Sequence, residues 1–87
     1  ETMDKEVIVY SAPMCGDCIR LKDFLDREGI AYETRDIKAD PTHAVHLEQQ
    51  TGKLGVPYLV INGTWLRGYI PGQPFDENWA RSLFEAV

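Results

Sequence analysis

The chain has 87 residues, of which 44% are hydrophobic and 26% charged, a composition typical of one compact soluble domain. Nine basic residues against fourteen acidic ones give a formal net charge of -5, which argues against nucleic acid and anionic membrane surfaces as partners. No apolar run is longer than the one at 7–10, whereas a membrane helix needs roughly 20 residues. We therefore expect a single domain over residues 1–87 that neither spans a membrane nor binds nucleic acid.

The first half of the chain predicts a β-α-β unit followed by a second helix. Residues 6–10, EVIVY, form an apolar run without alternation, which favours a central strand covered on both faces. Apolar side chains recur at helical spacing over 16–29, and a glycine ends that segment. Residues 31–37, AYETRDI, are strand-like but polar, which indicates a position at or near a sheet edge. The stretch 40–52 begins with Asp-Pro and ends with glycine, the start and stop signals of a helix.

The second half predicts a hairpin and a third helix. Residues 57–62, PYLVIN, and 64–69, TWLRGY, are short strands around Asn-Gly, the dipeptide that favours a two-residue hairpin. A helix capped by Asp76 would carry one apolar stripe, made of Trp79, Ala80, Leu83, Phe84 and Val87. A right-handed crossover would join the first two strands in parallel. The expected fold is α/β, in the order β-α-β-α-β-β-α, with a mixed four-stranded sheet and helices on both faces.

The two cysteines stand in the stretch SAPMCGDC, between the first strand and the first helix. A bond between Cys15 and Cys18 would close a loop of four residues and stabilise the fold little, which argues against a structural staple. A lone Cys-x-x-Cys beside a β-α-β pattern is typical of a redox motif. Helix-start amides and the helix dipole favour a negative sulfur at Cys15, so we expect it to be the nucleophile. Cys18, on the apolar stripe one turn further, is the expected resolving thiol.

Further residues are expected to shape a substrate site around these sulfurs. Gly16 keeps the approach to the sulfur open. Pro57 cannot donate to a strand ladder, so it should begin the third strand, where a cis Val56–Pro57 bond would turn the Val56 backbone outward to pair with an extended substrate. Met14, with Tyr69 and Ile70, is a candidate apolar rim for docking a protein substrate.

These features together resemble the glutaredoxins, the smallest members of the thioredoxin fold, from about Val7 to Phe84. The shared features are the first strand, Cys-x-x-Cys at a helix start, Val-Pro before the third strand, the Asn-Gly hairpin and a glycine after the fourth strand. The resemblance implies a minimal thioredoxin fold and a thiol-disulfide oxidoreductase acting on protein or glutathione mixed disulfides, with no prosthetic group required. The site residues it implies are the dithiol Cys15 and Cys18, the cis-proline platform Val56 and Pro57, and Gly68 with Tyr69 on the far wall of the groove.

Three departures from the family pattern concern glutathione. Ala12 stands where dithiol glutaredoxins carry a lysine, Gly16 and Asp17 replace Pro-Tyr inside the motif, and 67–72, RGYIPG, replaces Gly-Gly-x-Asp-Asp. Arg67 is a candidate contact for a carboxylate. The Gly-aromatic-x-Pro segment resembles redoxins that serve ribonucleotide reductase and are recharged by thioredoxin reductase. The reductant implied is therefore either glutathione, as a co-substrate, or a flavoprotein reductase.

Asp17 has a physical consequence of its own. A carboxylate next to the nucleophile disfavours a thiolate, because like charges repel. With no cation at Ala12, we expect Cys15 to be less acidified than in a glutaredoxin with basic flanks.

Two alternatives involve metal. His43 and His46 could complete a zinc site with the cysteines, but the crossover places their helix on the opposite face of the sheet, so we interpret them as surface histidines and expect no metal site. The second alternative is a redox-inert adaptor, or one that carries an iron-sulfur cluster on Cys15 and an external thiol. The start ETMDKE lacks the basic and apolar parts of a secretory signal, so we expect a cytoplasmic protein, and we expect a monomer that acts on disulfide-containing proteins.

Overall fold

The computed structural model describes residues 6–85, which form four strands and three helices in the predicted order. They are β1 (Val7–Ser11), α1 (Gly16–Arg27), β2 (Glu33–Asp36), α2 (Pro41–Thr51), β3 (Tyr58–Ile61), β4 (Thr64–Arg67) and α3 (Glu77–Glu85). Within these residues no helix is long and apolar enough to cross a membrane.

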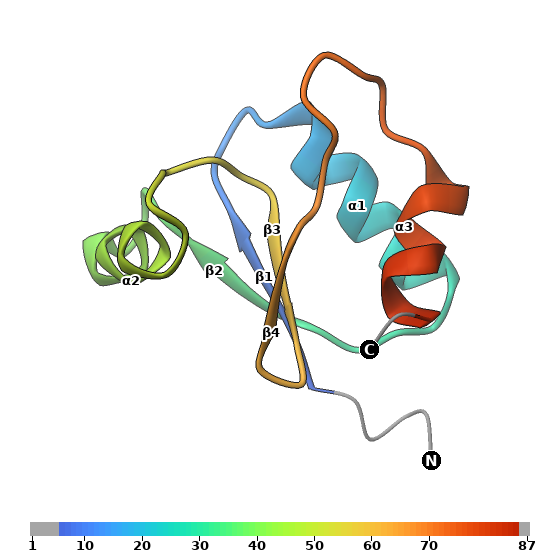
Figure 1. Cartoon of the computed structure of the whole chain (residues 1–87), viewed down its shortest axis with the longest axis horizontal. Helices are drawn as coiled ribbons and strands as arrows, with labels where there is room; N and C mark the ends of the chain where they lie inside the picture. The colour runs from blue at the N-terminus through green and yellow to red at the C-terminus, as the bar shows by residue number, and fades with distance from the viewer. Residues whose placement is uncertain (1–5, 86–87) are drawn as a thin grey trace.

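The strands form one sheet in the order β2-β1-β3-β4. β1 pairs with β2 in parallel and with β3 antiparallel, and β3 pairs with β4 antiparallel. The mixed sheet and the edge position of 31–37 are thus confirmed, although β2 begins only at Glu33, which pairs with Ile8 near the start of β1. Helices α1 and α3 lie on one side of the sheet and α2 on the other (Figure 1).

Each face of the sheet has its own core, because successive strand side chains point to opposite faces. The larger core lies between the sheet and helices α1 and α3, and consists of Val7, Val9, Leu21, Phe24, Leu25, Leu59, Ile61, Ala80 and Phe84. The smaller core lies under α2 and consists of Ile8, Tyr10, Ile37, Leu47 and Val60. All five residues of β1 are buried, as expected of a central strand covered on both faces.

The predicted start, stop and turn signals act as expected. The Asp40 carboxylate accepts a hydrogen bond from the N–H of Thr42 at 3.0 Å, and Gly52 ends α2 at φ +80°. Asn62 and Gly63 both have positive φ, +51° and +84°, which is the backbone of a type I′ hairpin turn.

One predicted core residue of α3 is placed differently. Ala80 and Phe84 are buried and Leu83 packs against the same core, but Trp79 is only half-buried and lies outside that core. The cause is geometric: the stripe that faces the core is narrow, with Ala80 and Phe84 four residues apart at its centre. Val87, the last residue of the predicted stripe, lies outside the described residues.

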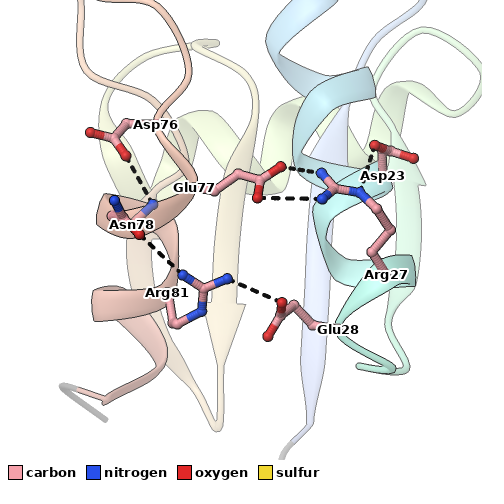
Figure 2. Close-up of polar contacts among 7 residues, drawn as sticks. All are labelled: Asp23, Arg27, Glu28, Asp76, Glu77, Asn78 and Arg81. Atoms are coloured by element: carbon pink, nitrogen blue, oxygen red, sulfur yellow. Dashed lines mark hydrogen bonds and ion pairs between the residues drawn. The ribbon is translucent and has the colours of Figure 1, made fainter.

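Ion pairs join α3 to the carboxyl-terminal half of α1 (Figure 2). Arg27 binds Asp23 on its own helix, with 3.0 Å between Nε and Oδ2, and it also binds Glu77 at the start of α3. One turn further along α3, Arg81 binds Glu28 with 3.1 Å between Nη2 and Oε2. The hydrogen bond from Arg27 holds the pKa of Glu77 below its ordinary value. These contacts fix the start of α3, and with it the end of the 68–76 segment that leads into it.

Candidate active site

Cys15 occupies the N-cap position of α1. Its backbone is extended, at φ -103° and ψ 105°, and its sulfur accepts a hydrogen bond from the N–H of Cys18 at 3.1 Å. Its carbonyl accepts the first helical bond, from the N–H of Ile19 at 3.1 Å. Free N–H groups at a helix start stabilise an anion, so this geometry favours a thiolate once the sulfur is reduced.

The two sulfurs are joined in a disulfide, with the Cα atoms of Cys15 and Cys18 5.2 Å apart. They differ in exposure: Cys15 is half-buried, whereas Cys18 is 1% exposed. Cys18 points inward on the face of α1 that also buries Leu21 and Leu25. A substrate disulfide can therefore approach Cys15 from solvent. Cys18 is shielded from solvent, but its sulfur can bond to that of Cys15.

The predicted platform lies beside Cys15. The Val56–Pro57 peptide bond is cis, and the carbonyl oxygen of Val56 lies 4.0 Å from the sulfur of Cys15. Pro57 is buried and immediately precedes β3, which begins at Tyr58, one residue later than predicted. The backbone of Val56 is thus placed where an extended segment next to a bound disulfide could pair with it.

Gly68 packs against this platform through contacts with Pro57. Its N–H donates to the carbonyl of Pro57 at 3.0 Å, and a Cβ atom at Gly68 would lie 3.0 Å from that oxygen and 3.1 Å from Cδ2 of Leu21. Only glycine fits so close an approach without a shift of backbone. Gly68 was predicted to line the far wall of the groove, but it is buried, so its contribution is packing against Pro57.

Tyr69 and Arg67 stand on the outer side of the platform. The hydroxyl of Tyr69 lies 2.6 Å from where a Cβ atom of Gly55 would be, so the tyrosine is packed over the loop that enters Val56. The guanidinium carbon of Arg67 lies 5.5 Å from the centre of the Tyr69 ring, a cation-π distance. Arg67 is exposed and has no carboxylate partner within residues 6–85, which leaves its donors available. Gly55 was not predicted from the sequence.

The predicted apolar rim is only partly assembled. Met14, just before the nucleophile, adopts a left-handed backbone at φ +60° that directs it outward, and its side chain is fully exposed. Ile70 is 38% exposed and begins a turn in which Gln73 N–H bonds the Ile70 carbonyl at 3.0 Å. Gly72 in that turn has φ +77° and follows proline, as a type II turn requires.

The charged surroundings of Cys15 differ from those expected from the sequence. The carboxylate of Asp17 pairs with Arg20, with 3.4 Å between Oδ1 and Nη1, and the same nitrogen lies 3.0 Å from where a Cβ atom of Gly16 would be. Ala12, at the position of the family's lysine, packs against the smaller core and brings no charge. Arg20 was not predicted as a site residue, although its spacing from Gly16 and Asp17, four and three residues, places all three on one helix face.

The two histidines lie on the α2 side of the sheet, as the crossover predicted. Nδ1 of His46 lies 3.0 Å from the hydroxyl of buried Tyr10, and Arg35 donates to the same hydroxyl at 3.0 Å. The ring of His43 meets Tyr10 edge-on, with centroids 6.3 Å apart. His46 is exposed, in line with its interpretation as a surface histidine, whereas His43 is half-buried against the Tyr10 ring. Within residues 6–85, no group of three or more His, Cys, Asp or Glu residues is arranged to hold a metal ion.

Comparison with known proteins gives a consistent result. A family model described as glutaredoxin matches residues 7–66, more than half of the chain. A glutaredoxin from Pseudomonas aeruginosa is 29% identical over 62 residues, which cover 71% of this chain and 74% of that protein. The structure of a glutaredoxin from Archaeoglobus fulgidus is similar with a TM-score of 0.70 and 25% identity, covering 92% of this chain and 86% of that one.

A buckwheat glutaredoxin solved in complex with glutathione is also similar, with a TM-score of 0.62 and 28% identity over 74% of this chain and 61% of that one. These likenesses confirm the predicted minimal thioredoxin fold, with its mixed four-stranded sheet and its cysteine pair at the start of α1. The chain therefore belongs to the glutaredoxin family of thiol-disulfide oxidoreductases.

Proposed function

We propose that the chain reduces disulfides in proteins, and mixed disulfides with glutathione, by passing two electrons from a Cys15–Cys18 dithiol. The observation that carries this proposal is the asymmetry of the pair: Cys15 is half-buried and its sulfur accepts a hydrogen bond from a helix-start amide, whereas Cys18 is 1% exposed. We place the reaction in the cytoplasm, where a reducing environment regenerates thiols, and assign it to a monomer.

In the first step the Cys15 thiolate attacks one sulfur of the substrate disulfide. A bond forms between Cys15 and that sulfur, the substrate disulfide breaks, and the other sulfur leaves as a thiolate that takes a proton from water. Residue 18's N–H, 3.1 Å from the Cys15 sulfur, stabilises the attacking anion. The cis platform at Val56 offers its backbone to an extended segment of the substrate, which aligns the disulfide with the attacking sulfur.

In the second step the Cys18 sulfur, as a thiolate, attacks Cys15 in the mixed disulfide. The Cys15–Cys18 bond forms, the bond between Cys15 and the substrate breaks, and the substrate leaves as a thiol after protonation. The Cα separation of 5.2 Å lies within the range in which two cysteines bond without movement of the backbone. The substrate has gained two electrons and the protein holds a disulfide.

Two reductants fit the regeneration step. Membership of the glutaredoxin family, and the likeness to a buckwheat glutaredoxin that binds glutathione, support glutathione as a co-substrate. The guanidinium of Arg67, exposed beside Tyr69 and without an ion-pair partner among residues 6–85, could take one glutathione carboxylate. The absence of charge at Ala12 supports instead a flavoprotein reductase, which docks as a protein and needs no charged cradle for a tripeptide.

The dithiol mechanism is tested by Cys18→Ser, which removes the attack that releases the substrate. We expect this variant to accumulate a mixed disulfide between Cys15 and a disulfide-bonded protein such as insulin, seen by mass spectrometry under non-reducing conditions. The matched control is Cys15→Ser, which should form no adduct. If Cys18→Ser forms no adduct either, the redox-inert or cluster-carrying adaptor becomes the better account.

The reductant is tested by following NADPH oxidation with the disulfide form of the protein. One reaction contains glutathione and glutathione reductase, and the other contains thioredoxin reductase. Turnover with glutathione would show that an alanine at position 12 is tolerated, and Arg67→Gln should then raise the KM for glutathione. Turnover only with the flavoenzyme would assign the protein to the redoxins that a reductase recharges directly.

A further inference from the structure

Arg20 folds back along α1 toward the active-site motif. Its Nη1 atom lies 3.4 Å from the Asp17 carboxylate and 3.0 Å from where a Cβ atom of Gly16 would be, so the guanidinium lies over the residue next to Cys15. The side chain is 61% exposed, and nothing else within residues 6–85 binds it. Gly16, Asp17 and Arg20 thus form one unit, in which the glycine leaves the room that the guanidinium occupies.

We infer that Arg20 is a positioning residue that sets the reactivity of Cys15, by supplying the cation that Ala12 does not and by cancelling the charge of Asp17. The inference rests on the proposed function, in which Cys15 is the nucleophile. No step of the sulfur chemistry passes through Arg20, which acts only through the electrostatic potential at the sulfur.

The direction of the effect follows from the charged and polar groups near Cys15 on α1 and on the platform side. On α1 the helix-start amides and Arg20 favour the thiolate, whereas Asp17 opposes it. On the platform side the carbonyl oxygen of Val56, 4.0 Å from the sulfur, also opposes it, and Arg67 lies further out across the Tyr69 ring. Removal of Arg20 takes away a cation and also leaves the negative charge of Asp17 uncompensated. Each of these two effects disfavours the Cys15 thiolate.

Gly16 has a role in this account beyond keeping the approach to the sulfur open. A methyl group there would press on the guanidinium at 3.0 Å, closer than most side-chain contacts, and the flexible arginine would move away. Gly16→Ala should therefore raise the apparent pKa of Cys15 when Arg20 is present and have little effect on that pKa when Arg20 is absent. Such non-additivity is expected of two residues that act through one contact.

The experiment measures the rate of Cys15 alkylation by iodoacetamide as a function of pH. Cys18→Ser is the background, because it leaves one thiol to alkylate and keeps the N–H of residue 18. We expect Arg20→Gln to raise the apparent pKa of Cys15 by about 0.5, which slows alkylation below that pKa about threefold. Arg20→Lys should restore most of the rate, because it keeps the charge. The matched control is Lys22→Gln, which removes a cation from the same helix away from Gly16 and should change the rate less.

Two further readouts separate electrostatics from a structural effect. The difference between the parent and Arg20→Gln should shrink in about 1 M salt, where exposed charges are screened within a few ångströms. Gly16→Ala should raise the apparent pKa of Cys15 in the parent but not in Arg20→Gln, whereas a purely steric effect on alkylation would lower the rate equally in both and leave the pKa unchanged.

An unchanged pH profile in Arg20→Gln, or an equal shift in Lys22→Gln, would overturn the inference and leave the proposed function intact. The proposed function fails on a different result, the absence of a trapped mixed disulfide in Cys18→Ser.

Discussion

The starts of α1 and α2 have similar backbone conformations but different roles, one reactive and one structural. Cys15 and Asp40 are both N-caps with extended backbone, at ψ 105° and 106°, and each accepts a hydrogen bond from the first turn of its helix. At Asp40 the acceptor is a permanent carboxylate, followed by a proline that fixes the first helical residue. At Cys15 the acceptor is a sulfur whose charge changes during the reaction, followed by glycine.

The difference shows what distinguishes a structural cap from a reactive one. The hydroxyl and N–H of Thr42 bond Asp40 and hold its pKa below the ordinary value of 3.8, so the charge there stabilises the fold. The N–H of Cys18, in the first turn of α1, meets a sulfur that is neutral in the disulfide and, in the proposed mechanism, becomes the attacking thiolate. The hydrogen bond from this N–H therefore stabilises the reduced protein more than the disulfide form, because a thiolate accepts it more strongly.

The largest expected effect comes from Cys15→Ser. Serine is a favoured N-cap, so α1 should stay folded. The free energy of unfolding of the variant should lie within about 1 kcal/mol of that of the reduced parent. Disulfide reductase activity should fall by at least about a thousandfold, because the nucleophile is gone. Circular dichroism and a coupled NADPH assay on the same sample measure both. Helix loss together with activity loss would mean that the sulfur is also an indispensable structural cap.

The converse variant is Asp40→Ala, which removes the structural cap. We expect a melting temperature about 5 °C lower, because the first turn of α2 loses its acceptor, with reductase activity unchanged. Differential scanning calorimetry and the same coupled assay test this pair of outcomes. A loss of activity would contradict the division between the two helix starts.

The smallest expected effect is a change in acid stability in Asp40→Asn. Because folding lowers the pKa of Asp40, its contribution is complete above pH 3.8, the unfolded value, and is lost as pH falls through the folded value. Asparagine still caps the helix but does not titrate. The fall in unfolding free energy between about pH 5 and about pH 3 should therefore be smaller in the variant, as urea titrations would show. Glu77, whose pKa is also lowered, accounts for some of the pH dependence that remains in the variant. An identical pH dependence of the unfolding free energy in both proteins would contradict the assignment to Asp40.

Features of this fold that depend on local chemistry were predictable from the sequence. Asp40, the Asn62–Gly63 turn and the cysteine at a helix start each act through neighbours a few residues away, so their patterns are visible in one stretch of chain. The burial of Cys18 followed from its place on the apolar stripe of α1.

What escaped prediction depends on contacts between distant residues or on the choice of a flexible side chain. The packing of Tyr69 over Gly55 joins residues in different loops, and no local pattern marks that glycine. The spacing of Arg20 permitted contact with Asp17, but an exposed arginine has many conformations and spacing does not select one. His46 was interpreted from its helix alone, whereas its partner Tyr10 is a buried residue 36 positions away.

The burial of Cys18 also determines how the protein responds to oxidants. In the reduced protein, hydrogen peroxide would reach the half-buried Cys15 and convert it to a sulfenic acid, while Cys18, at 1% exposure, would stay a thiol. Cys18 then condenses with the sulfenic acid, releases water and forms the disulfide that the catalytic cycle already contains. Irreversible oxidation of Cys15 to the sulfinic acid would therefore have to be faster than the condensation of its sulfenic acid with Cys18, one helical turn away. A thiol hidden from solvent protects the exposed one, and oxidative damage becomes a state that the ordinary reductant repairs.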